Sequence, residues 1–284
     1  MLIPEPPPDA QSAGAVRLSQ GAGPVTLIGL DCAAQHKRFG VARGRFEENG
    51  RCLVREVAAD LVDVTPVLRR WVEETPPAEP VLLAFDAPLG WPADLGSTLA
   101  KHAAGELIEP GSDALFRRRT DDFTHAILGK RPLEVGADKI ARVAVTALRL
   151  LHDLRTAERP FPLLWEPAEH ADWPANSGVI EVYPAAALLC RGLEVRGYKA
   201  KGKKNAAVAR SARMTLLDAL SAEMEFPADP EPLLASEDAF DAAICIRTAA
   251  DFVLGQVHRP PADAPAEVLR KEGWIWFGPP AGGA

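Results

Sequence analysis

The sequence predicts an α/β protein, with a mixed sheet flanked by helices and a helical insertion. Two short apolar runs, at residues 25–30 and 81–85, have the length and composition of buried strands. Two strands around a turn signal follow the first run, and helices and strands alternate after the second. Hairpin-type strands followed by alternating elements are typical of a mixed α/β sheet.

Apolar spacing and turn residues place the individual elements. Glu48-Asn49-Gly50 separates two hairpin strands, and Pro76-Pro77 ends the first helix. The expected strands are residues 25–31, 39–46, 52–57, 81–86, 178–184 and 273–277. The expected helices are residues 61–74, 137–155, 203–223 and 236–254. The irregular stretch at 91–177, which contains the second of these helices, is interpreted as an insertion in one domain spanning residues 23–278.

The composition of the 284-residue chain is that of a soluble globular protein, with 47% hydrophobic and 25% charged residues. A proline-rich arm at residues 1–22 and a tail at 279–284 are expected to be flexible. No apolar run reaches the roughly 18 residues of a membrane span, and the arm lacks the pattern of a signal peptide. We therefore expect a cytoplasmic protein without membrane contact.

The net charge of −7 argues against a nonspecific nucleic-acid coat. Residues 191–213 nevertheless hold eight basic residues and one acid, Glu194. A solvated helix face is the simpler interpretation of this basic strip. Selective contact with phosphate groups is the alternative.

Carboxylates end the two most apolar strands, Asp31 after the first run and Asp86 after the second. A charge at the tip of a buried strand is costly unless it is paired or binds a metal. Ligands also usually bind at the carboxyl edge of an α/β sheet. Each residue on its own could instead cap a turn, which is a common use of Asp.

Three further carboxylates are candidates. Asp238 and Asp241 lie three positions apart, on one face of the helix expected after Ser236. Two like charges on an inward face need a cation, although the helix dipole could account for Asp238. Glu181, in an apolar strand, is either functional or on an exposed face of the sheet.

Carboxylates without accompanying histidines favour Mg²⁺ or Mn²⁺ over zinc. The six histidines are scattered, no GxSxG motif occurs, and none of the four cysteines lies in a catalytic motif. Catalysis by histidine or cysteine is therefore the weaker hypothesis.

Several motifs make the chain resemble the domain-of-unknown-function 429 family, whose members are predicted to be ribonuclease H-like nucleases. They occur in family order at residues 29–31 (GLD), 85–90 (FDAPLG), 119–121 (RTD), 181–184 (EVYP), 197–199 (GYK), 237–242 (EDAFDA) and 272–275 (EGWI). The sequence departs from the family at Cys32-Ala33-Ala34, where many members have a glycine-rich turn.

The resemblance implies a ribonuclease H-like fold and a two-metal nuclease. Asp31 would bridge two Mg²⁺ or Mn²⁺ ions, and Asp86 with Asp238 or Asp241 would complete their ligands, for phosphodiester hydrolysis. Glu181 would be a further ligand or would orient water. The implied partner is nucleic acid of undetermined type, and the residues expected to contact its phosphates are Arg119, Lys199, Lys201 and Lys203.

Two other functions are compatible with the same fold. One is a nucleotide-binding ATPase or kinase related to actin, although Cys32-Ala33-Ala34-Gln35 lacks the phosphate turn that such proteins need. The other is a non-catalytic binding protein whose carboxylates are structural, because a fold alone never establishes activity.

Overall fold

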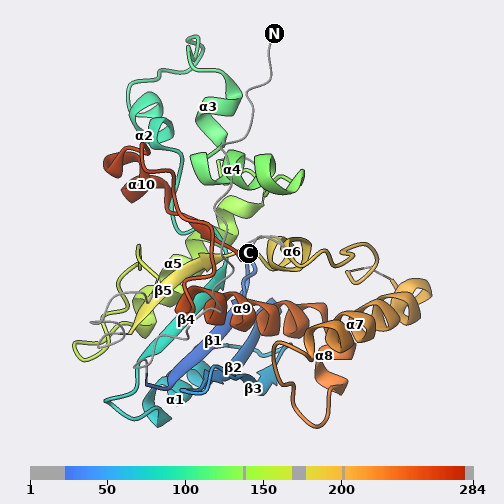
Figure 1. Cartoon of the computed structure of the whole chain (residues 1–284). Helices are drawn as coiled ribbons and strands as arrows, with labels where there is room; N and C mark the ends of the chain where they lie inside the picture. The colour runs from blue at the N-terminus through green and yellow to red at the C-terminus, as the bar shows by residue number, and fades with distance from the viewer. Residues whose placement is uncertain (1–22, 137–138, 168–176, 200–201, 279–284) are drawn as a thin grey trace, which may run out of the picture.

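One six-stranded sheet organises the computed structural model, which describes residues 23–136, 139–167, 177–199 and 202–278. The strand order is β3-β2-β1-β4-β5-β6, with β2 antiparallel to β1 and β3, and with β4, β5 and β6 parallel to β1 (Figure 1). The strands are β1 (Val25–Asp31), β2 (Gly40–Phe46), β3 (Cys52–Ala58), β4 (Val81–Asp86), β5 (Gly178–Val182) and β6 (Ile275–Trp276). The predicted mixed α/β sheet is confirmed, and its arrangement is compatible with a ribonuclease H-like fold.

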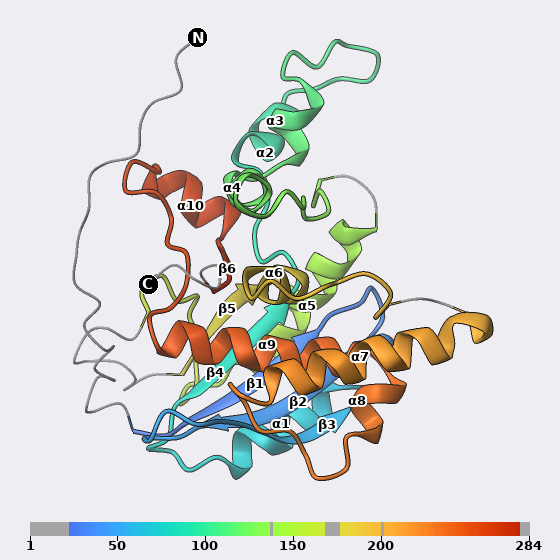
Figure 2. The ribbon, with the colours of Figure 1, turned by 45° about the vertical axis from the view of Figure 1, so that its right-hand side comes forward.

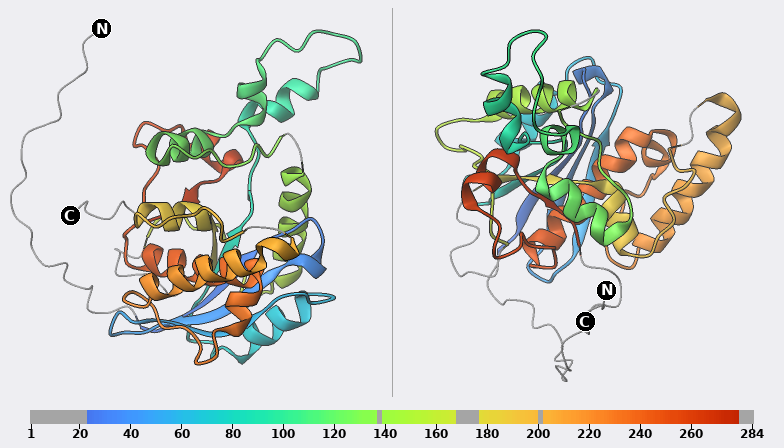
Figure 3. Two further views of the ribbon diagram at one scale, coloured as in Figure 1. Left: turned by 90° about the vertical axis from the view of Figure 1, so that its right-hand side faces the viewer. Right: turned by 90° about the horizontal axis from the view of Figure 1, so that it is seen from above.

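Helices cover both faces of this sheet. One face packs against α6 (Pro184–Cys190), α7 (Ala206–Leu220), α8 (Glu231–Ala235) and α9 (Glu237–Val253). The other face packs against α1 (Thr65–Glu74) and α5 (Ile140–Leu154). Alternate side chains of β1 serve the two cores, since Leu27 lies in the first and Ile28 in the second. Figure 3 shows the sheet between α9 and α1.

A group of short helices lies to one side of the sheet. It contains α2 (Ala93–Leu99), α3 (Ser112–Phe116), α4 (Arg119–Leu128) and α10 (Ala266–Glu272). Figure 2 shows α2 and α3 projecting away from the strands, whereas α5, from the same predicted insertion, packs with α1 on the sheet. The 3₁₀ helices are η1 (His36–Arg38) and η2 (Lys203–Asn205).

Several predicted boundaries differ from those in the structure. The strand expected to run to Pro184 ends at Val182, and Pro184 begins α6. Proline is well tolerated at the start of a helix, because the first turn has unpaired amides in any case. The helix expected from residue 61 begins at Thr65, and the one expected from residue 203 begins as η2 before continuing as α7. Ser236 caps α9, since its side chain accepts a hydrogen bond from the Ala239 amide.

Two glycines let α9 lie directly on the sheet. A Cβ atom at Gly29 would lie 2.0 Å from the carbonyl oxygen of Ala242, and one at Gly40 would lie 1.9 Å from that of Asp238. Both contacts are with backbone atoms, which cannot move aside as a flexible side chain can. This close packing brings the start of α9 beside the end of β1.

The predicted arm at 1–22 and tail at 279–284 lie outside the described residues. In the part of the chain that the structure describes, no helix combines the length and apolar character needed to cross a membrane.

Candidate active site

Three carboxylates converge at the edge of the sheet where β1 and β4 end. Asp31 and Asp86 are the last residues of their strands and lie opposite each other in the parallel register. Asp241, from α9, completes the group, and one carboxylate oxygen of each residue lies within 4.8 Å of the others. We call these three residues the acidic centre. Its members come from elements that are distant in sequence and meet only in the folded chain.

Asp241 shows that the acidic centre has unused ligand capacity. Its side chain is 0% exposed, and neither carboxylate oxygen has a hydrogen-bond partner. Burial raises the pKa of Asp241, whereas Lys199, whose Nζ forms an ion pair with Oδ2, and the nearby Tyr198 hydroxyl lower it. No hydrogen bond of ordinary geometry reaches Oδ1. An orphaned buried carboxylate oxygen is costly, and a cation would satisfy it. A set of clustered carboxylate oxygens fits a hard divalent cation such as Mg²⁺ or Mn²⁺.

Burial and mutual repulsion hold protons on the acidic centre. Burial, with Asp241 and Asp86 nearby, raises the pKa of Asp31 well above its ordinary value. Burial also raises the pKa of Asp86 to about 7, although Lys199 acts in the opposite direction. A bound cation would offset both effects, because it favours the ionised carboxylates.

Lys199 is the cationic side chain that faces the acidic centre. Burial alone would lower its pKa, but Asp241 and Asp86 raise it above its ordinary value, so the ammonium stays charged. Its Nζ lies 5.6 Å from the centroid of the Tyr198 ring. The backbone here is anchored by the buried Arg213, which donates to the Tyr198 carbonyl at 2.6 Å. The structure thus places Lys199, a predicted phosphate ligand, beside the carboxylates.

The structure shows that Asp241, and not Asp238, belongs to the acidic centre, a choice that the sequence left open. Asp238, one helical turn earlier, is half-buried and lies outside the group of three, although it is near enough to raise the pKa of Asp31.

Glu181 lies close to the acidic centre but is already paired. Arg118 donates to both of its carboxylate oxygens, at 2.9 and 2.7 Å, and the Leu89 amide donates to Oε2 at 2.9 Å. Arg118 also donates to Asp121 at 2.9 and 3.2 Å and to the Glu272 carbonyl at 3.0 Å. Glu181 therefore orients Arg118 and its surroundings, and the structure does not bring it among the three clustered carboxylates.

The structure does not bring Arg119 to the acidic centre, and several arginines of the predicted basic strip are paired within the protein. Arg119 lines a separate cavity with Phe123 and Trp274. Its neighbour Arg118 is the one that pairs with Glu181. Lys201 lies outside the described residues, and the structure describes the backbone of Lys203 only. Several arginines of the strip form ion pairs within the protein, namely Arg191 with Glu223 and Asp251, Arg196 with Glu194, and Arg210 with Glu231.

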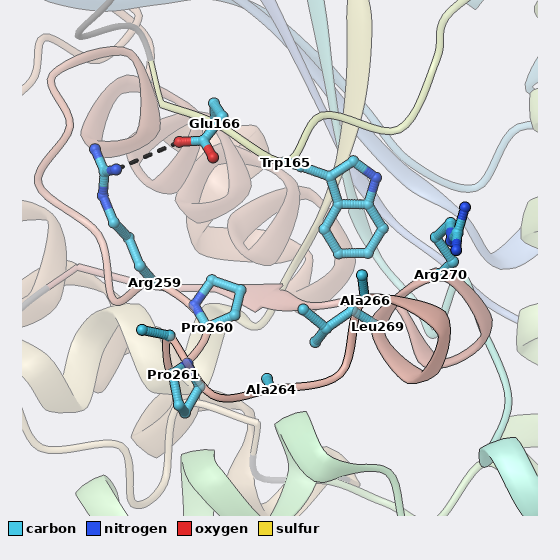
Figure 4. Close-up of a pocket in the computed structure, with 10 residues that line it drawn as sticks. Trp165, Glu166, Arg259, Pro260, Pro261, Ala264, Ala266, Leu269 and Arg270 are labelled. Carbon is cyan, nitrogen blue, oxygen red and sulfur yellow. Dashed lines mark hydrogen bonds and ion pairs between the residues drawn. The ribbon is translucent and has the colours of Figure 1, made fainter.

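A cavity of about 240 Å³ opens beside the acidic centre. Asp86 and Lys199 line it together with Tyr183 and Leu133, neither of which sequence reasoning identified. A roomier cavity of about 610 Å³ lies elsewhere, between Trp165 and the segment leading into α10 (Figure 4). Among the described residues, the carboxylate that lines it is Glu166, which is paired with Arg259 at 3.3 Å. The smaller cavity is therefore the one that adjoins the acidic centre.

Comparison with protein families assigns the chain. The model described as "Protein of unknown function (DUF429)" matches residues 29–266, which is most of the sequence. The chain belongs to the DUF429 family. The DUF429 match includes the end of β1 and all of β4, β5 and α9, and with them all three residues of the acidic centre. Searches of curated proteins and of solved structures found no match.

Proposed function

We propose that this DUF429 member is a divalent-metal-dependent hydrolase that cleaves phosphodiester bonds of nucleic acid. The observation that carries the proposal is the acidic centre, in which Asp241 keeps buried oxygens without hydrogen-bond partners beside Asp31 and Asp86. The strand order, which is compatible with a ribonuclease H-like fold, and the cationic Lys199 beside the carboxylates support it.

Asp31, Asp86 and Asp241 would hold Mg²⁺ or Mn²⁺, with Asp238 available to a second ion. When bound, such ions supply activation of water and stabilisation of charge on the phosphate. Lys199, whose side chain is 46% exposed and whose Nζ forms an ion pair with Asp241, would turn its ammonium to phosphate oxygens when substrate binds. Tyr183 remains a neutral hydrogen-bond donor, since burial raises its pKa to about 12. In the net reaction water adds across the P–O bond, leaving a hydroxyl on phosphorus and a proton on the departing oxygen.

Cleavage of labelled nucleic acids tests this proposal. We expect hydrolysis of at least one among single strands, duplexes, hybrids and junctions with Mg²⁺ or Mn²⁺, and none with chelator. Asp241→Asn should reduce the rate at least about a hundredfold, because several kcal/mol of charge stabilisation are lost. Asp218→Asn, which changes an exposed carboxylate on α7, is the matched control and should retain the rate. Chelator-resistant cleavage, or equal rates in the two variants, would contradict the proposal.

A further inference from the structure

We infer that the 240 Å³ cavity beside the acidic centre binds one unpaired nucleobase, so that the substrate is a single strand or a strand with a base out of its stack. The inference rests on the proposed function and specifies its substrate class. Asp86 belongs both to the acidic centre and to the cavity lining. A group in the cavity therefore lies next to the position of the phosphate that is cleaved.

The lining of the cavity combines charged residues with apolar and aromatic ones. Arg118 and Glu181 pair with each other, and the other charged residues of the lining are Asp86 and Lys199, whose Nζ forms an ion pair with Asp241. The apolar and aromatic part of the lining includes Pro88, Pro132, Leu133, Ile140 and Tyr183. A nucleotide has the same combination, with a planar ring attached to a charged phosphate. Stacking on aromatic and apolar side chains is the usual way in which proteins hold an unpaired base.

The exposure of Leu133 also fits an apolar ligand. Its side chain lines the cavity, yet 66% of it is exposed. Single exposed leucines are common on protein surfaces. This one lies at the mouth of a charged cavity, where a stacked base would cover it and remove its apolar surface from water.

The volume of the cavity suits a single ring system better than a stacked base pair. Its 240 Å³ is below the roughly 300–1,000 Å³ of pockets for drug-sized ligands. One ring system fits this volume. A duplex would have to fray or to extrude the base before the base could enter, which costs a few kcal/mol of pairing and stacking.

Abasic substitution tests the inference. Single strands that carry one abasic residue at successive positions would be compared with the intact strand and with its duplex, by kcat/KM for cleavage. We expect a loss of about 5- to 150-fold when the abasic residue adjoins the cleaved bond, equivalent to one lost stack. The duplex should be cleaved at least about tenfold more slowly, because its bases must first leave the stack.

Leu133→Ala should lower kcat/KM for the intact strand about three- to tenfold and reduce the penalty of the abasic residue. Leu107→Ala, which truncates an 80% exposed leucine between α2 and α3, is the matched control and should change neither. Fluorescence anisotropy with the same strands and Ca²⁺ provides a binding readout that does not depend on cleavage.

The outcomes distinguish this inference from the proposed function. Cleavage that is insensitive to abasic residues at every position, or as fast on the duplex, overturns the base-binding cavity and leaves the hydrolase standing. Failure to cleave any substrate overturns the proposed function. In that case equal anisotropy affinities for intact and abasic strands would overturn the cavity as well, whereas weaker binding of the abasic strand would uphold it.

Discussion

Asp31→Asn is expected to lose most of the stabilisation by divalent cations and to be more stable than the wild type in chelator. The wild-type protein should gain about 2.7 kcal/mol at a free Mn²⁺ concentration one hundred times its Kd, which raises the Tm by about 5–10 °C. Asp31→Asn should gain much less, because one ligand is missing. In chelator the order is inverted, with the variant more stable than the wild type, since it no longer buries a third carboxylate beside Asp86 and Asp241.

The pH dependence in chelator follows from the same carboxylates. Asp86 has a pKa of about 7 in the folded protein against an ordinary value of 3.8. The folded protein then binds more protons than the unfolded chain between these values. The contribution of protonated Asp86 to the free energy of unfolding is fully present below about pH 3.8 and is lost as the pH rises to about 7. We therefore expect the increase in wild-type stability on addition of Mn²⁺ to be largest at neutral pH and to become smaller in acid.

Thermal unfolding of the wild type, Asp31→Asn and Asp218→Asn, with Mn²⁺ and with chelator, measures these effects. Asp218→Asn, altered on the exposed side of α7, should follow the wild type in both conditions. If Asp31→Asn is less stable than the wild type in chelator, or gains as much from Mn²⁺, the carboxylates are structural and the cation site is absent.

Arg118→Met should be among the most destabilising single substitutions in the chain. The guanidinium is 1% exposed and donates to Glu181, Asp121 and the Glu272 carbonyl. These partners belong to β5, α4 and α10, so Arg118 joins the group of short helices to the sheet. Removing it leaves two buried carboxylates without their cation, a loss of about 3–5 kcal/mol in the free energy of unfolding.

The adjacent Arg117→Met is the matched control. Arg117 pairs with Glu134 at 2.7 Å and with Asp113, and the side chains of both partners are more exposed than those of Asp121 and Glu181. Because water screens such pairs, we expect little change in unfolding free energy. Urea denaturation of both variants gives the comparison. Similar midpoints for Arg117→Met and Arg118→Met would show that the buried network does not stabilise the fold.

β1 and β4 could be predicted because each is an apolar run, and β2 and β3 because a turn signal separates them, all of which are signals of the local sequence. Asp31 and Asp86 could be selected for the same reason, since each ends such a run. Asp238 and Asp241 could not be separated, because residues three apart share one helical face. Only the depth at which α9 packs decides between them. The local signals of that depth are Gly29 and Gly40, since a glycine in a strand often marks a close backbone approach.

Other features depended on tertiary contacts. Arg117, Arg118 and Arg119 are chemically identical neighbours, and nothing in the sequence shows that the middle one is buried with Glu181. The strand before Pro184 was predicted two residues too long, because proline both ends strands and begins helices. The cavity lined by Leu133 and Tyr183 is formed by segments far apart in sequence, so no local pattern indicates it.

Anomalous diffraction from crystals equilibrated with Mn²⁺ locates the proposed cation itself. We expect an Mn²⁺ peak among the carboxylates of Asp31, Asp86 and Asp241, and no such peak in Asp241→Asn. Crystals of the wild type that hold no Mn²⁺ among these three side chains, at a concentration that supports cleavage, would contradict this expectation.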